Sequence, residues 1–146
     1  MTESDTEFAK TSAAQPGLAL RGGLWLAQIV ISFLFCYSGY MKLMVPLPVL
    51  AKMGMIWPSQ VSPAFLTFIG LVDMAGGIGI LLPALTRIKP RLTVLAALGC
   101  SVLQVLAILF HVSRGEFSVL PLNVVLLALS LFVLWGRGRR APIVAR

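Results

Sequence analysis

The stretch FIGLVDMAGGIGILLP, residues 68–83, is apolar or glycine throughout except for one carboxylate, Asp73. It lies in a run, 64–85, that is long enough as a helix to cross a hydrocarbon core about 30 Å thick. The whole chain has the same character, since 58% of its 146 residues are hydrophobic and 12% are charged. In typical soluble proteins about 45–50% of the residues are hydrophobic and about 25% are charged. The stretch is therefore predicted to be a membrane helix with an acid in its middle.

Three other runs, 24–41, 92–110 and 117–135, are apolar and of spanning length. Short polar joints favour antiparallel neighbours. The sequence thus predicts an all-α polytopic membrane protein, an antiparallel four-transmembrane-helix bundle. The expected parts are a disordered cytoplasmic tail at 1–20, a membrane domain at 21–142 with helices at about 24–44, 63–85, 91–112 and 117–136, and a basic C-terminal tail at 143–146.

The chain has a net charge of +7, and the distribution of its basic residues between the predicted loops indicates the orientation of the protein in the membrane. With the amino terminus in the cytoplasm, the inside segments hold Lys10, Arg21, Arg87, Lys89, Arg91, Arg137, Arg139, Arg140 and Arg146. The outside segments hold Lys42, Lys52 and Arg114. By the positive-inside rule both termini of this multi-pass protein are cytoplasmic. The expected partner is the lipid bilayer and not nucleic acid, because a nucleic-acid site needs bases clustered on a folded face.

Each predicted helix has one line of small and polar residues, spaced mostly by alternate steps of four and three. Such a line stays on one face of a helix in a left-handed bundle, and in lipid the polar face turns inward. The lines are Gln28, Ser32, Phe35, Gly39 and Lys42; Leu66, Gly70, Asp73, Gly77 and Ile80; Thr93, Ala97, Cys100, Gln104 and His111; and Asn123, Leu127, Ser130 and Leu134. Small residues allow close helix packing, which we expect of Gly39, Gly70, Gly76, Gly77 and Gly79.

Ionisable and amide side chains within these lines gather in the outer half of the predicted bundle. Asp73 must either bind a proton or find a cation and hydrogen-bond donors. Asn123 is a candidate donor; the flexible stem of Lys42 either reaches Asp73 or carries its charge to the headgroups. His111 is either a boundary residue or a group that titrates near neutral pH. The candidates for handling a ligand or proton are Asp73, Lys42, His111, Asn123 and Gln104.

The sequence offers no motif for chemistry of its own. It has no G-x-S-x-G, no glycine-rich phosphate loop and no metal-ligand spacing, so no catalytic residue and no metal site is assigned. Cys36 and Cys100 are not in a C-x-x-C pair and are expected to be small buried residues. No cofactor is identifiable from these residues; if catalysis occurs, its chemistry belongs to a cofactor or a partner.

Three segments, SGYMKL, FIGLVDMAGGIGILLPALTR and FHVSRGE with the following LPLNVVLLALSLFVLWGR, together resemble the DoxX-like family of small bacterial membrane proteins. The resemblance runs from about Leu24 to Pro142. It implies a four-helix protein of the bacterial inner membrane, related to subunits linked to quinone-dependent oxidation of sulfur compounds and to oxidoreductase complexes in oxidative stress. A quinone is then the candidate cofactor. The family's polar pattern falls on Lys42, Gly70, Asp73, Pro83, His111 and Asn123, with a glutamate more usual at position 73.

Three functions follow as hypotheses. The first is an integral membrane subunit associated with a redox system, quinone- or thiol/sulfur-linked, with a polar site in the outer half. It would be a non-catalytic subunit beside oxidoreductase partners or within a homo-oligomer. The second is a structural anchor or assembly protein without a site of its own. The third is a proton-coupled small-molecule carrier that uses Asp73 and requires dimerisation.

Overall fold

A computed structural model describes residues 15–146, and these residues form helices and no strand. The long helices are α2 (Leu18–Met44), α4 (Pro63–Thr86), α5 (Arg91–Ser113) and α6 (Leu120–Trp135). The short elements are helix α3 (Leu47–Lys52), the 3-10 turns η1 (Trp57–Gln60) and η2 (Phe117–Val119), and the π-helical turn η3 (Gly136–Arg140). The predicted all-α class with long apolar helices is confirmed.

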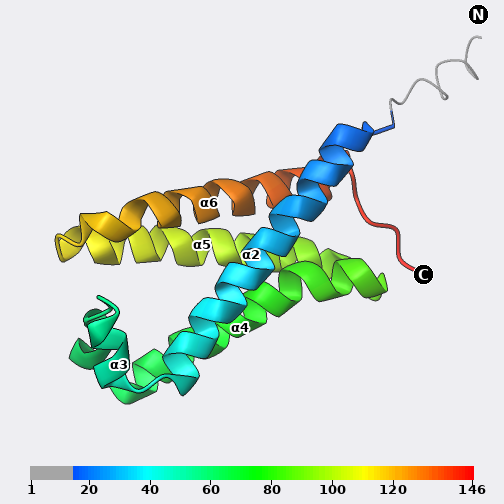
Figure 1. Cartoon of the computed structure of the whole chain (residues 1–146). Coiled ribbons are helices and arrows are strands. Elements are labelled where there is room, and N and C mark those ends of the chain that lie inside the picture. Colours follow the sequence, from blue (N-terminus) through cyan, green and yellow to red (C-terminus); the bar gives the residue numbers. More distant parts are fainter. Residues whose placement is uncertain (1–14) are drawn as a thin grey trace, which may run out of the picture.

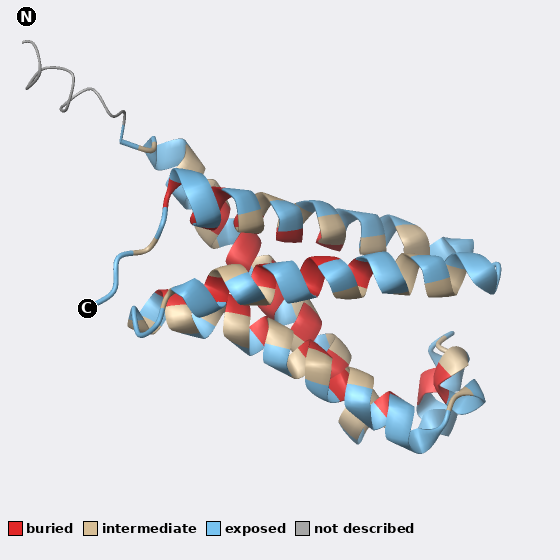
Figure 2. Ribbon diagram, turned by 180° about the vertical axis from the view of Figure 1, so that it is seen from behind, coloured by how far each residue is buried: buried red, intermediate tan, exposed pale blue. Residues whose placement is uncertain are grey.

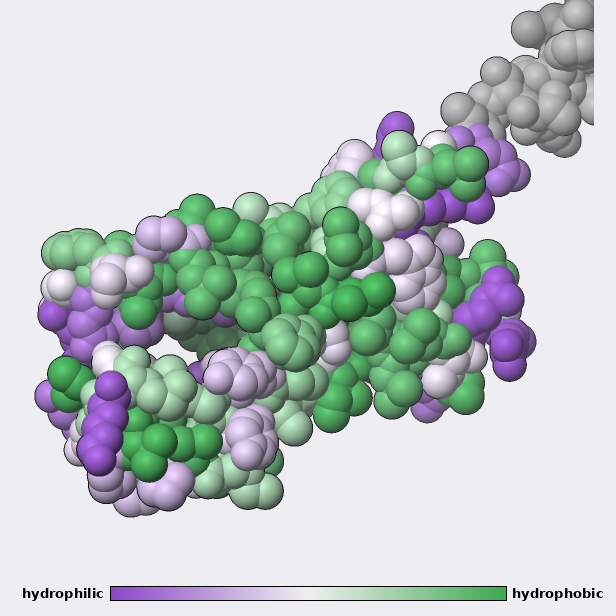
Figure 3. Space-filling view, in the orientation of Figure 1, coloured by the Kyte–Doolittle hydropathy of each residue, from purple (hydrophilic) through white to green (hydrophobic). Residues whose placement is uncertain are grey.

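Four helical segments are long and apolar enough to cross a membrane, the last of them running from Phe117 to Arg140. Their outward faces carry large apolar side chains such as Phe33, Leu71 and Leu109. Figure 3 shows this apolar surface extending along the helices. A soluble protein does not expose apolar surface on this scale, so these faces are suited to lipid.

Two helix starts differ from those predicted. Helix α2 begins at Leu18 rather than near 24, because the backbone N–H of Arg21 donates to the Gly17 carbonyl and Gly23 packs against the Phe132 ring. The expected tail therefore overlaps the helix at residues 18–20, and its residues 1–14 lie outside the described chain. The predicted helix from 117 begins with the separate turn η2.

The helices form two antiparallel pairs, α2 with α4 and α5 with α6 (Figure 1). The start of α2, the α4–α5 joint and the C-terminus lie at one end, which we call the terminal end. The α2–α4 connection with α3 and η1, and the turn between α5 and η2, lie at the opposite end, which we call the loop end. The pairs pack together towards the terminal end and diverge towards the loop end (Figures 1 and 2).

Glycines bring α2 and α4 into backbone contact. A Cβ built on Gly39 would lie 2.8 Å from the Gly70 carbonyl oxygen, and one built on Gly77 would lie 2.9 Å from the Ser32 carbonyl oxygen. Across α4, a Cβ on Gly76 would lie 2.9 Å from Cys100 Sγ. Because any larger residue at these positions would push the helices apart, the glycines determine how closely α4 packs between α2 and α5.

The buried face of α4 follows the predicted line, since Leu66, Gly70, Asp73, Gly77 and Ile80 are all buried (Figure 2). The lines predicted for α2 and α5 are also buried along most of their length.

The line predicted for α6 is fully buried only at Ser130, while Asn123, Leu127 and Leu134 are partly buried. The buried residues are Leu126, Ser130 and Val133, and the adjacent turn buries Arg137. Helix α6 packs mainly on α5 and contacts α2 less, so its buried face is rotated from the one that a symmetric bundle would use.

Substitution of Gly77 by alanine tests the close crossing. The new methyl would meet the Ser32 backbone, and overpacking of this kind costs about 1–3 kcal/mol. We expect Gly77→Ala to lower the free energy of unfolding in detergent micelles by that amount. The matched control is Gly99→Ala on α5, where a Cβ meets nothing within 4 Å and helix propensity favours alanine. Equal stability of the two variants would contradict the crossing.

Candidate functional site

Three side chains from α2 and α4 form a buried polar cluster, Ser38–Lys42–Asp73. Lys42 Nζ lies 2.7 Å from Asp73 Oδ2, and Ser38 Oγ donates to the same oxygen at 2.8 Å. Lys42 Nζ also donates to Ser38 Oγ. The side chains of Lys42 and Asp73 are 9% and 7% exposed. Two of the residues proposed from sequence are therefore brought together as an ion pair.

The helix crossing explains how Lys42 reaches an acid placed deeper in the bundle. Ser38 and Lys42 are one turn apart on α2, and a Cβ on Gly70 would lie 3.2 Å from Lys42 Cβ. Side chains lean towards the N-terminus of their helix, so the lysine stem runs from the loop end towards the middle of α2. Asp73 lies one turn further into the bundle along α4, where that stem leads.

The cluster leaves hydrogen-bonding capacity on both charged groups. Both donors to Asp73 use Oδ2, so Oδ1 accepts no hydrogen bond within residues 15–146. A lysine ammonium has three N–H donors, of which two go to Asp73 and Ser38. The cluster can therefore offer one donor and one acceptor side by side to a bound molecule.

Trp57 of η1 connects this cluster to α5. Lys42 Nζ lies 5.8 Å from the centre of the Trp57 ring, within the range of a cation–π contact. The Trp57 ring also packs edge-on against two rings of α5. Its centre lies 5.6 Å from that of Phe110 and 6.4 Å from that of His111. The indole therefore spans the space between the diverging helix pairs at the loop end.

A second polar group, the loop-end clasp, consists of Trp57, Gln60, His111, Arg114 and Glu116. His111 Nδ1 donates to Glu116 Oε2 at 2.6 Å, and Arg114 Nε donates to Glu116 Oε1 at 2.9 Å. Arg114 also donates to the Gln60 side chain. The clasp therefore ties η1 to the end of α5, and His111 is engaged there and not with Asp73.

The clasp determines the ionisation of Glu116. Burial raises the pKa of this carboxyl, but the hydrogen bonds from His111 and Arg114 and their positive charge outweigh it, so the pKa lies below its usual value. A carboxylate with a lowered folded-state pKa stabilises the fold above its unfolded pKa, about 4.3. That stability is lost as the pH falls through the folded-state value.

The proposed hydrogen bond from Asn123 to Asp73 is not formed. Asn123 Nδ2 and Gln104 Oε1 are both buried without a partner in the described chain. The reason is the divergence of the helix pairs, which separates the loop half of α6 from α4. Gly76 of α4 and Cys100 of α5 lie against each other and so are at the same depth. Asp73 and Gln104 each lie one helical turn from this contact, towards the loop end. Gln104 and Asp73 are therefore at similar depth.

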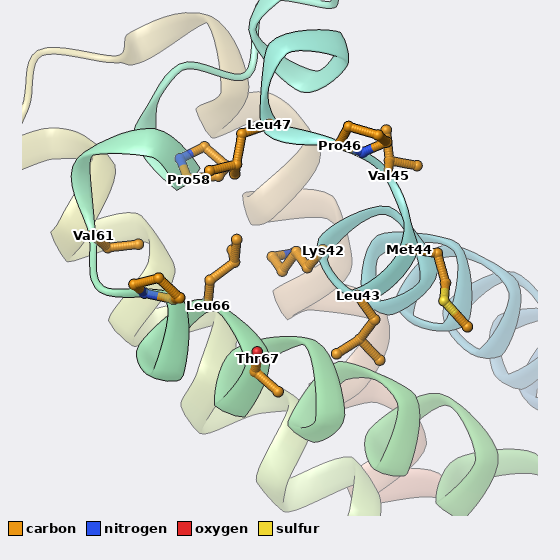
Figure 4. A pocket seen from close by; sticks show the side chains of 11 residues that line it. Lys42, Leu43, Met44, Val45, Pro46, Leu47, Pro58, Val61, Leu66 and Thr67 are labelled. Atoms are coloured by element: carbon orange, nitrogen blue, oxygen red, sulfur yellow. The ribbon is translucent and has the colours of Figure 1, made fainter.

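A cavity of about 310 Å³ adjoins Lys42 beneath the α2–α4 connection. Figure 4 shows Lys42 within a wall of apolar side chains that includes Leu43, Leu66 and Pro58. Figure 3 shows a hollow at the loop end between the α3–η1 segment and the ends of α5 and α6. The volume is at the small end of the range for ligand pockets, about 300–1,000 Å³. In residues 15–146 no three His, Cys, Asp or Glu side chains gather to hold a metal ion.

Sequence reasoning missed Ser38, Trp57 and Gln60 as members of these clusters. Ser38 could have been found, because it precedes Lys42 by one helical turn. Trp57 lies between the predicted helices, outside their lines of small and polar residues. Its position between Lys42 and His111 depends on how the α2–α4 connection folds back, which helical periodicity does not describe.

The fold and the buried cluster define a multi-pass membrane protein whose loop half contains charged groups. The sequence pattern of the DoxX-like family matches residues 26–133, and the chain belongs to this family. Neither the curated proteins nor the solved structures compared with the chain gave a match.

A double-mutant cycle tests the ion pair. Removing one partner of a buried pair leaves an uncompensated charge and costs about 3–5 kcal/mol, so we expect that loss in the stability of Lys42→Met and of Asp73→Leu. The double variant removes both charges and should recover much of it. Unfolding in mixed micelles measures the free energy of unfolding of the wild type, the two single variants and the double variant. Additive losses would show that the two side chains do not interact.

Acid titration tests the loop-end clasp. Lowering the pH below about 4.3 should lower the stability of the wild type, because protonation of Glu116 removes its charge-assisted hydrogen bonds. Glu116→Gln should lack this part of the pH dependence and be less stable at neutral pH. The unfolding midpoint at several pH values measures both. Identical pH profiles for the two proteins would exclude the role assigned to Glu116.

Proposed function

We propose that the protein is an integral membrane subunit associated with a redox system, and that the Ser38–Lys42–Asp73 cluster binds a quinone head group. The observation that carries this proposal is a charged donor and a carboxylate acceptor kept side by side inside an apolar bundle. Ionisable residues within membrane segments are costly to bury, and they commonly mark functional sites. The role is binding within an oxidoreductase assembly; no catalytic residue is assigned.

The hydrogen-bonding groups suit both oxidation states of a quinone. The remaining N–H of Lys42 can donate to a quinone carbonyl, and Asp73 Oδ1 can accept from the hydroxyl of a quinol. Because Lys42 and Asp73 neutralise each other, the site favours a neutral ligand over an anion. This favours the quinone over a small charged sulfur compound.

The surroundings of the cluster suit a flat apolar ring. Trp57 offers an aromatic face next to Lys42, and the adjoining cavity wall is largely apolar. The cavity of about 310 Å³ is suited to a head group, while an isoprenoid tail could extend along the apolar helix surfaces into lipid. In the same half of the bundle, Gln104 Oε1 and Asn123 Nδ2 are buried and have no hydrogen-bond partner among residues 15–146.

Quinone binding tests the proposal directly. The protein, purified from native membranes in mild detergent, is extracted and its quinones identified by mass spectrometry. It is then titrated with a short-chain benzoquinone, and Trp57 fluorescence is followed in a background of Trp25→Phe and Trp135→Phe. We expect copurified quinone, and at least tenfold weaker binding in Lys42→Met/Asp73→Leu, which removes the polar groups without leaving a lone buried charge.

The matched control is Ser130→Ala, which alters a buried polar residue whose Oγ has no partner in the described chain and which lies well away from Lys42 along α6. It should bind quinone as the wild type does. If Lys42→Met/Asp73→Leu binds quinone normally, the cluster has no such role. Loss of stability alone in that variant would favour a structural anchor.

A further inference from the structure

The terminal end contains a buried arginine in a polar chain that crosses three helical elements. Arg137 is 5% exposed, and its Nε donates to Gln28 Oε1 at 2.7 Å. Gln28 Nε2 in turn donates to the Ile80 carbonyl at 2.8 Å. The guanidinium also lies 4.9 Å from the centre of the Trp25 ring and donates to the Ala141 carbonyl. Arg137 is thus held in one position by α2 and by its own C-terminal segment.

None of these partners is an anion. Gln28, Trp25 and the Ala141 carbonyl are all uncharged, and Arg137 Nη2 is buried without a partner within residues 15–146. A buried charge without a counter-ion is costly, whereas guanidinium groups pair well with carboxylate and phosphate oxygens. The positive charge of Arg137 is therefore positioned but not neutralised by the described chain.

Two further cations share a cavity with Arg137. Lys89 and Arg91 line the same space of about 670 Å³, at the start of α5. Apolar residues complete its wall: Pro90, Leu92, Val94, Pro142, Ile143 and Ala145. The acids of the described chain, Asp73 and Glu116, both belong to the loop half. Figure 3 shows hydrophilic residues gathered at the terminal end.

The C-terminal segment forms one side of this cavity. The π-helical turn η3 closes with a hydrogen bond from the Ala141 N–H to the Gly136 carbonyl at 2.7 Å. The chain then runs back along the terminal end, where the Arg146 N–H donates to the Arg87 carbonyl at 3.2 Å. The segment is therefore attached at both ends and holds Pro142 and Ile143 opposite the start of α5.

We propose that this cavity binds a phosphoryl anion, and that its source is the headgroup of an anionic phospholipid. Arg137, Arg91 and Lys89 pair with the phosphate oxygens, and the apolar wall contacts the glycerol and the first acyl carbons. A free phosphate would use the cations but not the apolar wall. In the orientation predicted from the positive charges, this end faces the leaflet that is rich in anionic lipid.

Lipid binding to the full chain tests the site. The protein in neutral detergent is titrated with short-chain phosphatidylglycerol and, separately, with phosphatidylcholine, and bound lipid is counted by native mass spectrometry. We expect one tightly bound phosphatidylglycerol, bound at least tenfold more tightly than phosphatidylcholine. Lys89→Gln/Arg91→Gln, which alters exposed residues, should weaken this binding at least tenfold. Arg137→Gln should also abolish it, but that variant disturbs the Gln28 hydrogen bond and is secondary.

The matched control is Arg139→Gln/Arg140→Gln, which removes two exposed cations from the same end without altering the cavity wall. It should change the affinity by less than twofold. Equal weakening by the two double variants would overturn the proposal in favour of diffuse surface attraction. No weakening by either would overturn it by showing that Lys89 and Arg91 do not bind the lipid. A separate titration with inorganic phosphate distinguishes the sources: tight phosphate binding that excludes the lipid would refute the lipid assignment.

Discussion

The close crossing of α2 and α4 is the constraint on which the rest of the structure depends. Gly39, Gly70 and Gly77 let the two backbones touch, and only at that separation does the Lys42 ammonium reach Asp73. In lipid the charges cannot be left to water, so the distance between the helices decides whether the pair is tolerable. The glycines and the ion pair therefore depend on one another. The glycines bring the helices close enough for Lys42 to reach Asp73, and the ion pair holds the two helices in register.

The two ends of the bundle differ in whether their positive charges are paired with acidic side chains. At the loop end, cations and acids pair: Lys42 with Asp73, and His111 and Arg114 with Glu116. At the terminal end the described residues include cationic but no acidic side chains, and the side-chain contacts of Arg137 are with neutral groups. A neutral cluster suits a neutral ligand, whereas a positive cavity suits an anion. The same bundle thus offers two chemically different environments at its two ends.

Much of the fold could be predicted from the sequence, because in lipid the small and polar residues of each helix turn inward and their spacing shows which face is buried. The line Leu66, Gly70, Asp73, Gly77 and Ile80 lies on the buried face, as helical spacing indicates. The predicted line of α6 is only partly buried, and the fully buried face, with Leu126 and Val133, is rotated from it, because spacing cannot show that a bundle is asymmetric.

The candidate site was predicted only in part, since residues outside the long helices complete it. Trp57 and Gln60 reach α5 only because η1 folds back over the loop end, and no periodic pattern reports such a fold. Arg137 was within reach of the same reasoning, because one more step of three along the line from Ser130 and Leu134 arrives at it. It was assigned to the surface instead, since its charge alone indicated topology.

The buried face of α4 connects the two ends. Asp73 and Ile80 are seven positions apart in the sequence, which places them about two turns apart on one side of the helix. Asp73 accepts from Ser38 and Lys42, while the Ile80 carbonyl accepts from Gln28, which holds Arg137. Pro83 lacks an N–H, so the Gly79 carbonyl next to Ile80 in the chain has no i→i−4 donor within the helix. Gly77 lies between the two sets of contacts and against the backbone of α2. A shift of α4 along α2 would therefore break the hydrogen bonds at both levels, and this makes the helix pair a single rigid support for both the cluster at Asp73 and the cavity at Arg137.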